Sequence, residues 1–372
     1  MTQKIPMTAE HVAAGHPDKF CDQVADRYLD EALKLAGDDP AVRRSVRTAI
    51  ECLAKDNLLI ISGEVKLPAA VRREIDPVAL AREVWLDIGY PSCEKAERLT
   101  VIDHIRAQSA DIARGTDAEV GGAGDQGIMV GYATDETPEM MPREWVLARD
   151  LIMKLRRLQL DGTLPWLRAD CKSQVSLAAD GEVQSVILAV QHAPDVTQEE
   201  IRQQVYERVI TPVIGEVPQE RVTVNGTGQF VIGGPTGDAG VVGRKIVVDA
   251  YGPRVPVGGG AYSGKDASKV DRSAAYMARH IAKTIVARGD AKECTVRLAY
   301  GIGKHQPEMV TAVTDDGRDL SAWVRQAFGD LSPGAIIERL GLFSPNGWSY
   351  YQTAAHGHYG RDLFPWEKIA DV

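Results

Sequence analysis

The chain has 372 residues, of which 44% are apolar, 26% charged and 6% aromatic. This composition is typical of a folded protein with two or three domains and excludes a disordered or fibrous one. Its 43 basic and 52 acidic residues give a net charge of −9, which excludes a broad cationic surface for nucleic acid or an acidic membrane. Any polyanion that the protein binds must therefore be met by local clusters of cations.

The cysteines and the first residues indicate the compartment. The 5 cysteines lie far apart and form no CxxC pair, which favours reduced thiols. The N-terminus lacks the apolar stretch of a signal peptide, and no run approaches the ~20 apolar residues that cross a bilayer. We therefore expect a cytoplasmic protein without a membrane segment.

The first third of the chain has the pattern of a helix, two strands and a second helical region. Apolar residues recur at helical spacing within 18–35, and strand-like segments follow at 44–54 and 57–66. An amphipathic stretch, interrupted by a proline, covers 69–87.

The same order recurs in the second third. Leucines at helical spacing predict a helix from residue 144, and the segment 172–191 predicts two strands around an Ala-Asp-Gly turn. A closing helix is predicted over 197–210.

A third unit begins with a helix at Asp271, followed by predicted strands at 294–301 and 309–317 and a helix at 319–328. The first helices of the three units begin near residues 18, 144 and 271, so the pattern repeats about every 126 residues. The pattern predicts three similar units, each a β-sheet covered by helices. The Gly-rich connections between the elements are where we expect the chemistry.

The most informative Gly-rich segment is a near match to a phosphate-binding loop. Gly259 to Lys265 spells GxxxxGK between a strand-like segment, 245–251, and a helix. The next residue is Asp266, where a standard P-loop needs a hydroxyl for magnesium. Lys265 and Lys269 nevertheless precede a helix with Asp271 in its first turn, which favours a phosphate site over a solvated hairpin.

A second candidate site opens the first helix, at residues 15–19. His16 and Asp18 fit a plain helix start, in which the histidine caps the helix and the carboxylate complements its dipole. They equally fit a triphosphate site, which would need magnesium because a carboxylate repels phosphate. The residue types alone leave both interpretations open.

Other charged residues lie on loops or strands, where a solvated surface position is the alternative to a role in binding: Glu51, Glu64, Asp170, Lys172, Asp238, Arg244 and Lys245. No Ser/His/Asp order and no HExxH motif is present, so serine hydrolase and zinc protease activities have no support.

Five ordered segments together resemble the S-adenosylmethionine synthetase (methionine adenosyltransferase) family: 8–26, 122–142, 164–175, 230–252 and 258–279. The resemblance runs from about residue 8 to the C-terminal HGHYGR. It implies an α+β fold of three pseudo-threefold-related domains, which we place at 1–107, 123–232 and 233–372. A mobile active-site loop is implied at 108–122.

The resemblance also implies an activity. An enzyme of this family transfers the adenosyl group of ATP to the sulfur of L-methionine by in-line attack at C5′, then hydrolyses tripolyphosphate to pyrophosphate and phosphate. Two magnesium ions per site, potassium, and a homodimer with sites at the subunit interface, in a homotetramer, are implied as well. The alternatives are a non-catalytic homologue that binds ATP or methionine and a generic ATPase.

The site residues implied by the resemblance fall into four groups. The catalytic positions are His16, Lys172, Arg244 and Lys265. The ATP-binding positions are His16, Asp170, Lys172, Gln229, Phe230, Asp238, Arg244, Lys245, Ala261 and Lys265. The methionine-binding positions are Glu64, Gln108, Asp238 and Lys269. The metal positions are Asp18 and Asp271 for magnesium and Glu51 for potassium. Gln229 stands where the family usually has arginine, which removes one cation from the nucleotide site.

Overall fold

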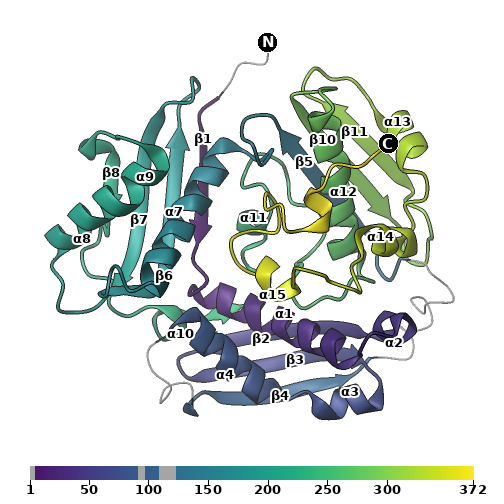
Figure 1. Ribbon diagram of the computed structural model, residues 1–372, viewed down its shortest axis with the longest axis horizontal. Helices are drawn as coiled ribbons and strands as arrows, with labels where there is room; N and C mark the ends of the chain where they lie inside the picture. The colour runs from purple at the N-terminus through teal and green to yellow at the C-terminus, as the bar shows by residue number, and fades with distance from the viewer. Residues whose placement is uncertain (1–4, 91–96, 109–122) are drawn as a thin grey trace.

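The computed structural model describes residues 5–90, 97–108 and 123–372 (Figure 1). Three β-sheets organise these residues. The first has the order β4 (Thr100–Ala107), β3 (Leu58–Lys66), β2 (Arg47–Lys55) and β9 (Gly240–Val241). The second has the order β1 (Met7–Val12), β6 (Leu167–Leu177), β7 (Val183–His192) and β8 (Val222–Val224). The third has the order β11 (Met309–Thr314), β10 (Glu293–Tyr300) and β5 (Gly127–Thr134).

Each sheet takes one edge strand from another third of the chain. β1 is antiparallel to β6, with Met7 opposite Leu177, and β5 is antiparallel to β10, with Gly127 opposite Tyr300. β9 is antiparallel to β2, with Leu53 opposite Val241. These exchanges tie the three units together through backbone hydrogen bonds.

One long helix packs on each sheet. α1 (Pro17–Leu35) packs on β2, α7 (Arg143–Leu160) on β6 and β1, and α12 (Val270–Ala287) on β5 and β10. Figure 1 shows these helices toward the middle of the molecule with the sheets around them. Each helix begins within one residue of the start that its periodicity predicts, and the expected α+β fold of three sheet-and-helix units is confirmed. The boundaries at 107, 122 and 232 stay predictions, and residues 109–122 lie outside the described part.

The remaining helices are shorter: α2 (Pro40–Ser45), α3 (Ala69–Glu74), α4 (Pro77–Ile88), α8 (Gln198–Val205), α9 (Thr211–Ile214), α10 (Gly234–Gly237), α11 (Ile246–Asp249), α13 (Ser321–Phe328), α14 (Pro333–Leu340) and α15 (Tyr350–Thr353). A π-helical stretch, Tyr206–Ile210, joins α8 to α9. Single 3₁₀ turns lie at Gln219–Arg221 and Pro365–Glu367. The interruption expected within 69–87 is confirmed, because Asp76 caps α4 by accepting from the backbone of Val78 at 2.9 Å.

Several local expectations are wrong. β6 begins at Leu167 instead of residue 172. The first predicted strand starts at Arg47 instead of residue 44, because α2 extends to Ser45. The apolar run expected as a strand over 245–251 forms the helical turn α11, in which the amide of Asp249 bonds the carbonyl of Lys245 at 2.9 Å. Short apolar runs fit either structure by pattern alone. Here the turn carries the Asp249 carboxylate to the ammonium of Lys19 on α1.

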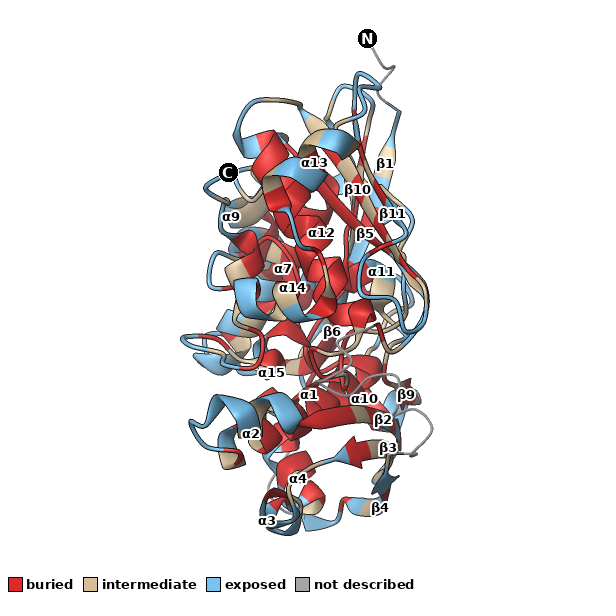
Figure 2. Ribbon diagram, turned by 90° about the vertical axis from the view of Figure 1, so that its right-hand side faces the viewer, coloured by how far each residue is buried: buried red, intermediate tan, exposed pale blue. Residues whose placement is uncertain are grey.

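Buried apolar side chains form two cores. The larger is shared by the sheets of β2 and β10 with α1 and α12, and the smaller lies between α7, α8 and the sheet of β6. Figure 2 shows the buried residues running through the middle of the molecule. The cysteines at 21, 52, 171 and 294 are buried and free. Among the described residues, every helix is too short or too polar to cross a membrane.

The buried ring of His11, on β1, makes the folding free energy depend on pH. Its Nε2 atom is buried without a hydrogen-bond partner, and burial is the main cause that lowers its pKa to about 3. Because the unfolded chain binds a proton at this histidine below pH ~6.5 and the folded chain does not, stability is lost as the pH falls below that value. Compared with His11→Gln, the wild type should lose about 2 kcal/mol more unfolding free energy between pH 7.5 and pH 5. Urea titrations at the two pH values would measure this, and equal losses would contradict it.

Candidate active site

The candidate site begins at the N-terminus of α1, where His16 is the capping residue. Its Nδ1 atom accepts a hydrogen bond from the amide of Asp18 at 3.1 Å. Burial first, and then the charges of Lys245 and Lys172, lower the pKa of His16 to about 3. The ring is therefore neutral, and because Nδ1 accepts, its proton lies on Nε2. The capping interpretation is confirmed, and it leaves Nε2–H to donate to an anion.

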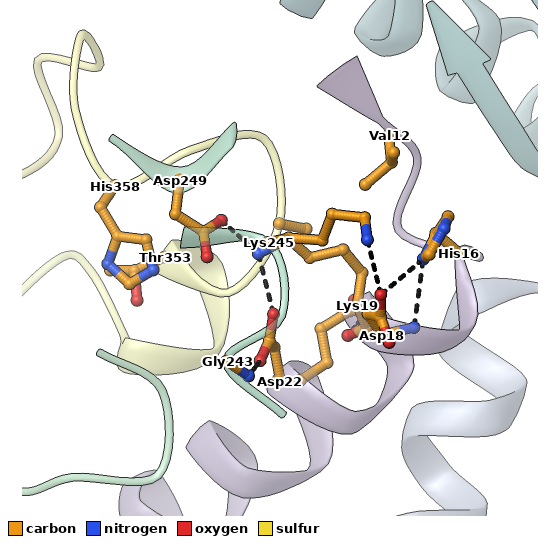
Figure 3. Close-up of polar contacts among 12 residues, drawn as sticks. Val12, His16, Asp18, Lys19, Asp22, Gly243, Lys245, Asp249, Thr353 and His358 are labelled. Carbon is orange, nitrogen blue, oxygen red and sulfur yellow. Dashed lines mark hydrogen bonds and ion pairs between the residues drawn. The ribbon is translucent and has the colours of Figure 1, made fainter. Parts of the chain in front are cut away.

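Asp18 joins the helix start to the loop that follows β9 (Figure 3). Its carboxylate accepts from the amide of Val241 at 2.9 Å and from Nζ of Lys245 at 2.6 Å. Nη1 of Arg244 lies 3.6 Å away. Burial raises the pKa of Asp18, but the bonds from Lys245 and Val241 outweigh it, so that the pKa is lowered. Since residues 242–245 form a turn, both cations reach the same carboxylate.

The start of α1 lies against β6. The amide of Ala13 bonds the carbonyl of Cys171 at 2.8 Å. A Cβ added to Gly15 would lie 2.4 Å from the carbonyl oxygen of Ala169, so only glycine fits this approach. The neighbouring Lys172 is exposed, and its charge is one cause of the lowered pKa of His16. A third cation is thus brought to the helix start.

Asp170, two residues before Lys172, is buried beside α10. One oxygen accepts from the amide of Gly234 at 2.8 Å, while the other has no hydrogen-bond partner. Burial is the main cause that raises the pKa of Asp170 to about 6, and the charge of Asp238 raises it further. The structure therefore brings Asp170, Lys172 and Asp238 to one region.

The Gly-rich loop before α12 presents another pair of opposite charges. Nζ of Lys265 lies 2.9 Å from one oxygen of Asp271, whose other oxygen accepts from the amide of Gly260 at 2.7 Å. Burial raises the pKa of Glu51 on β2, and the positive charge of Lys265 opposes that rise. Glu51 therefore lies within the electric field of Lys265.

Asp266, the residue after Lys265 in this loop, points into the protein. It is fully buried, accepts from the amides of Thr48 and Ser268 at 2.8 Å each, and forms an ion pair with Lys269. Its function is to fasten the loop to β2. Since a helical turn and not a strand precedes the loop, the segment is not a standard P-loop.

The two cationic loops touch each other at Gly243 and Ala261. A Cβ added to Gly243 would lie 2.5 Å from the Cβ of Ala261. A cluster forms where these loops meet β6, β2, the start of α1 and the residue after α10. It contains the following predicted residues: His16, Asp18, Glu51, Asp170, Lys172, Asp238, Arg244, Lys245, Ala261, Lys265 and Asp271. We call it the phosphate cluster. It holds four cations and five carboxylates, of which Asp18 and Asp271 are paired with lysines. Such cations, beside carboxylates, are suited to bind a polyphosphate together with a divalent cation.

Glu64 and Gln108 lie farther along the first sheet. Glu64 is opposite Arg106 in the register of β3 and β4. The amide of Gln108 bonds the carbonyl of Val65 at 2.9 Å, and its side-chain oxygen is buried without a partner. A cavity of about 280 Å³ lies beside it, lined by Val65, Lys66, Leu67, Arg72, Ile105, Arg106, Ala107 and Gln108.

The last predicted positions have other surroundings. Lys269 is paired with Asp266, Gln229 is exposed, and the amide of Phe230 bonds Nε2 of His192 at 3.0 Å. Within residues 5–90, 97–108 and 123–372, no hydrogen bond or ion pair joins the side chains of Glu64, Gln108, Gln229 or Phe230 to the phosphate cluster. Nor does the described part contain a group of three His, Cys, Asp or Glu side chains that could hold a metal by themselves.

The supporting residues beneath the cluster were not predicted from the sequence. Lys19 is completely buried and paired with Asp22 and Asp249, and Asp26 is paired with Arg272 (Figure 3 shows the first group). One signal was available, because aspartates recur at every fourth position of α1. An amphipathic surface helix would place such a stripe in solvent, and here Asp18, Asp22 and Asp26 are buried.

Family comparisons cover nearly the whole chain. The models of the S-adenosylmethionine synthetase N-terminal, central and C-terminal domains match residues 4–110, 120–230 and 232–368. The chain belongs to the S-adenosylmethionine synthetase family. The resemblance found in the five sequence segments is thereby confirmed.

Three curated relatives of this family are similar over nearly their full length. The S-adenosylmethionine synthase of Borreliella afzelii is 41% identical, over 98% of this chain and 94% of the relative. Its counterpart in Petrotoga mobilis is 42% identical over 100% of this chain and 98% of the relative. The S-adenosylmethionine synthase of Deinococcus deserti is 42% identical over 97% of this chain and 96% of the relative.

Proposed function

We propose that this chain is a methionine adenosyltransferase, which forms S-adenosylmethionine from ATP and L-methionine and hydrolyses the resulting tripolyphosphate to pyrophosphate and phosphate. The observation that carries the proposal is the phosphate cluster. It joins cations from β6 and from two loops to the capped start of α1, in a chain that belongs to the S-adenosylmethionine synthetase family. Its four cations are suited to a triphosphate leaving group, with a divalent cation between the phosphates and the carboxylates.

The chemistry requires positioning and charge stabilisation. A thioether sulfur carries no proton, so its attack on C5′ of the ribose needs no general base and depends on alignment. As the bond from C5′ to oxygen breaks, negative charge develops on the triphosphate. Lys172, Arg244, Lys245 and Lys265 stabilise that charge, and neutral His16 donates a hydrogen bond from Nε2.

The donor set suits magnesium. Proteins bind this ion through one or two carboxylates while substrate phosphates and water complete its octahedron, so Asp18 and Asp271 fit without a third protein ligand. Bound magnesium would neutralise part of the phosphate charge. The ammonium groups of Lys245 and Lys265 pair with the same two carboxylates. Glu51 is the proposed potassium ligand.

We further propose a homodimer, with sites completed at the subunit interface, and its assembly into a tetramer. Large apolar side chains are exposed on strands of all three sheets, on the faces opposite the buried side chains: Leu53, Ile102, Ile128, Ile187 and Met309. Exposed apolar faces of this kind are typical of subunit interfaces. Contact with a second copy could also bring the cavity at Gln108, which we assign to methionine, next to a phosphate cluster. Four buried free thiols are consistent with the reducing cytoplasm.

The activity is tested by incubating the purified protein with ATP, L-methionine, magnesium and potassium. The expected result is S-adenosylmethionine, pyrophosphate and phosphate in equal amounts, with none formed when methionine or magnesium is omitted. ATP cleavage that does not depend on methionine would instead indicate an ATPase. Binding of ATP or methionine without turnover would indicate a non-catalytic homologue.

A further inference from the structure

One face of α1 carries a column of four aspartates, one per turn. Residues four apart in a helix lie above one another, so these side chains share a face. Each accepts a hydrogen bond from a backbone amide between residues 241 and 351. The pairs are Asp18 with Val241, Asp22 with Gly243, Asp26 with Gly264, and Asp30 with Tyr350 and Tyr351. We call this column the aspartate ladder.

The second member of the ladder, Asp22, uses both of its carboxylate oxygens. Oδ1 accepts from the amide of Gly243 at 2.8 Å, and Oδ2 accepts from Nζ of Lys19 at 2.9 Å (Figure 3). Asp22 and Lys19 are both completely buried. In an asparagine, an NH₂ group would replace one of these two oxygens and would face the amide of Gly243 or Nζ of Lys19, donor against donor. The position therefore needs a carboxylate.

The amide that Asp22 holds comes directly before Arg244 and Lys245. Gly243 has a φ of 74°, a conformation that favours glycine, and it packs against Ala261 with no room for a Cβ. The backbone at this point is thus fixed from one side by Asp22 and from the other by the Lys265 loop. A displacement here would move both cations together.

The same arrangement recurs one turn farther along α1. Asp26 accepts from the amide of Gly264 at 2.9 Å, directly before Lys265, and forms an ion pair with Arg272 at 2.7 Å. A Cβ on Gly264 would lie 2.2 Å from the carbonyl oxygen of Ile50. Two neighbouring turns of one helix therefore each hold the backbone in front of a cation of the phosphate cluster.

We infer that Asp22 is a positioning residue for the reaction: by holding the amide of Gly243, it sets where Arg244 and Lys245 meet the triphosphate. This inference rests on the proposed function. The role of Asp22 goes beyond stabilising the fold. The helix fixes the distance between Asp22 and Asp26 and thereby the spacing of the two cationic loops. Asp22 does not itself touch the substrate.

The test compares Asp22→Ala with Asp30→Ala. Asp30 lies on the same helix and holds two backbone amides, at 2.9 and 2.7 Å, but in a segment without proposed site residues. For folded Asp22→Ala, kcat/KM for ATP should fall about 100-fold, the size of effect that a misplacement of about 1 Å produces. Binding of methionine alone should stay unchanged. Asp30→Ala should keep the wild-type kcat/KM even if its melting temperature falls as much as that of Asp22→Ala.

Hydrogen exchange followed by mass spectrometry gives a second measurement that does not depend on turnover. The segment 240–245 should exchange faster in Asp22→Ala and stay protected in Asp30→Ala. If the wild type makes no S-adenosylmethionine, the proposed function fails, while this exchange pattern still decides whether Asp22 holds the loop. Equal kcat/KM in Asp22→Ala and wild type, or unchanged exchange of 240–245, would overturn the inference.

A loop-side variant covers the case in which Asp22→Ala does not fold. Gly243→Ala introduces a Cβ at the contact with Ala261 and displaces the same backbone, while the buried pair of Lys19 and Asp22 stays intact. The same fall in kcat/KM for ATP supports the inference. Wild-type kinetics in Gly243→Ala would overturn it.

Discussion

Replacing Lys265 with alanine is expected to lower kcat for S-adenosylmethionine formation by about 100- to 1,000-fold, the usual effect of removing one preorganised donor from a developing negative charge. Nζ of Lys265 lies in a loop at the phosphate cluster, 2.9 Å from Asp271, and it is partly exposed. The change therefore removes a cation from the site without opening a cavity in either core. Steady-state rates of product formation, with circular dichroism and thermal melting on the same samples, would measure both effects.

Lys34→Ala is the matched control for Lys265→Ala. Lys34 lies at the other end of α1, is largely exposed and pairs only with the neighbouring Glu31 within the described structure. Its removal should leave kcat unchanged, because Lys34 lies at the other end of α1 from the phosphate cluster. It should also change the stability little, since an exposed ion pair contributes little to it. A folded Lys265→Ala protein with wild-type kcat would remove Lys265 from the catalytic assignment without affecting the family membership.

The long helices of the fold were predictable because their periodicity is long and strong. Asp18, Glu144 and Asp271 lie in the first turns of α1, α7 and α12, and each helix repeats its apolar stripe over four or more turns. The exchange of edge strands was not predictable from periodicity. β1 has 6 residues and β9 has 2, and which sheet a short strand joins is decided by tertiary contacts that no local pattern encodes.

The phosphate cluster was predictable in its residue types but not in its connections. The charges beside Gly-rich segments were visible, whereas the pairing of Lys245 with Asp18 joins residues 227 positions apart. Asp266 shows the same limit. By sequence it stands in the phosphate loop, but in the structure it bonds Thr48 on β2, 218 positions away. Any carboxylate can pair with any cation that lies close to it. The partners therefore depend on the tertiary structure and could not be predicted from the residue types.

Glu367→Ala is expected to have the largest effect on stability, a loss of about 3–5 kcal/mol, because it leaves buried cations without their counter-ion. Both carboxylate oxygens of Glu367 are used: Oε1 accepts from Nε of Arg279 at 3.0 Å and Oε2 from Nη2 at 2.8 Å. Lys283 donates to Oε2 at 2.9 Å. The side chains of Arg279 and Glu367 are 0% exposed. Urea or thermal unfolding of the variant would measure the loss.

Glu367→Gln and a pH series separate the charge from the packing of the side chain. Burial raises the pKa of Glu367, but Arg279 and Lys283 outweigh it, so the folded chain holds this carboxyl below its usual pKa. The stability that the charge contributes is therefore fully present above pH ~4.5 and is lost as the pH falls through the lowered pKa. The difference in unfolding free energy between wild type and Glu367→Gln should be constant near neutral pH and shrink below pH ~4.5. A difference that stayed constant into acid would mean that shape, and not charge, holds the C-terminal segment on α12.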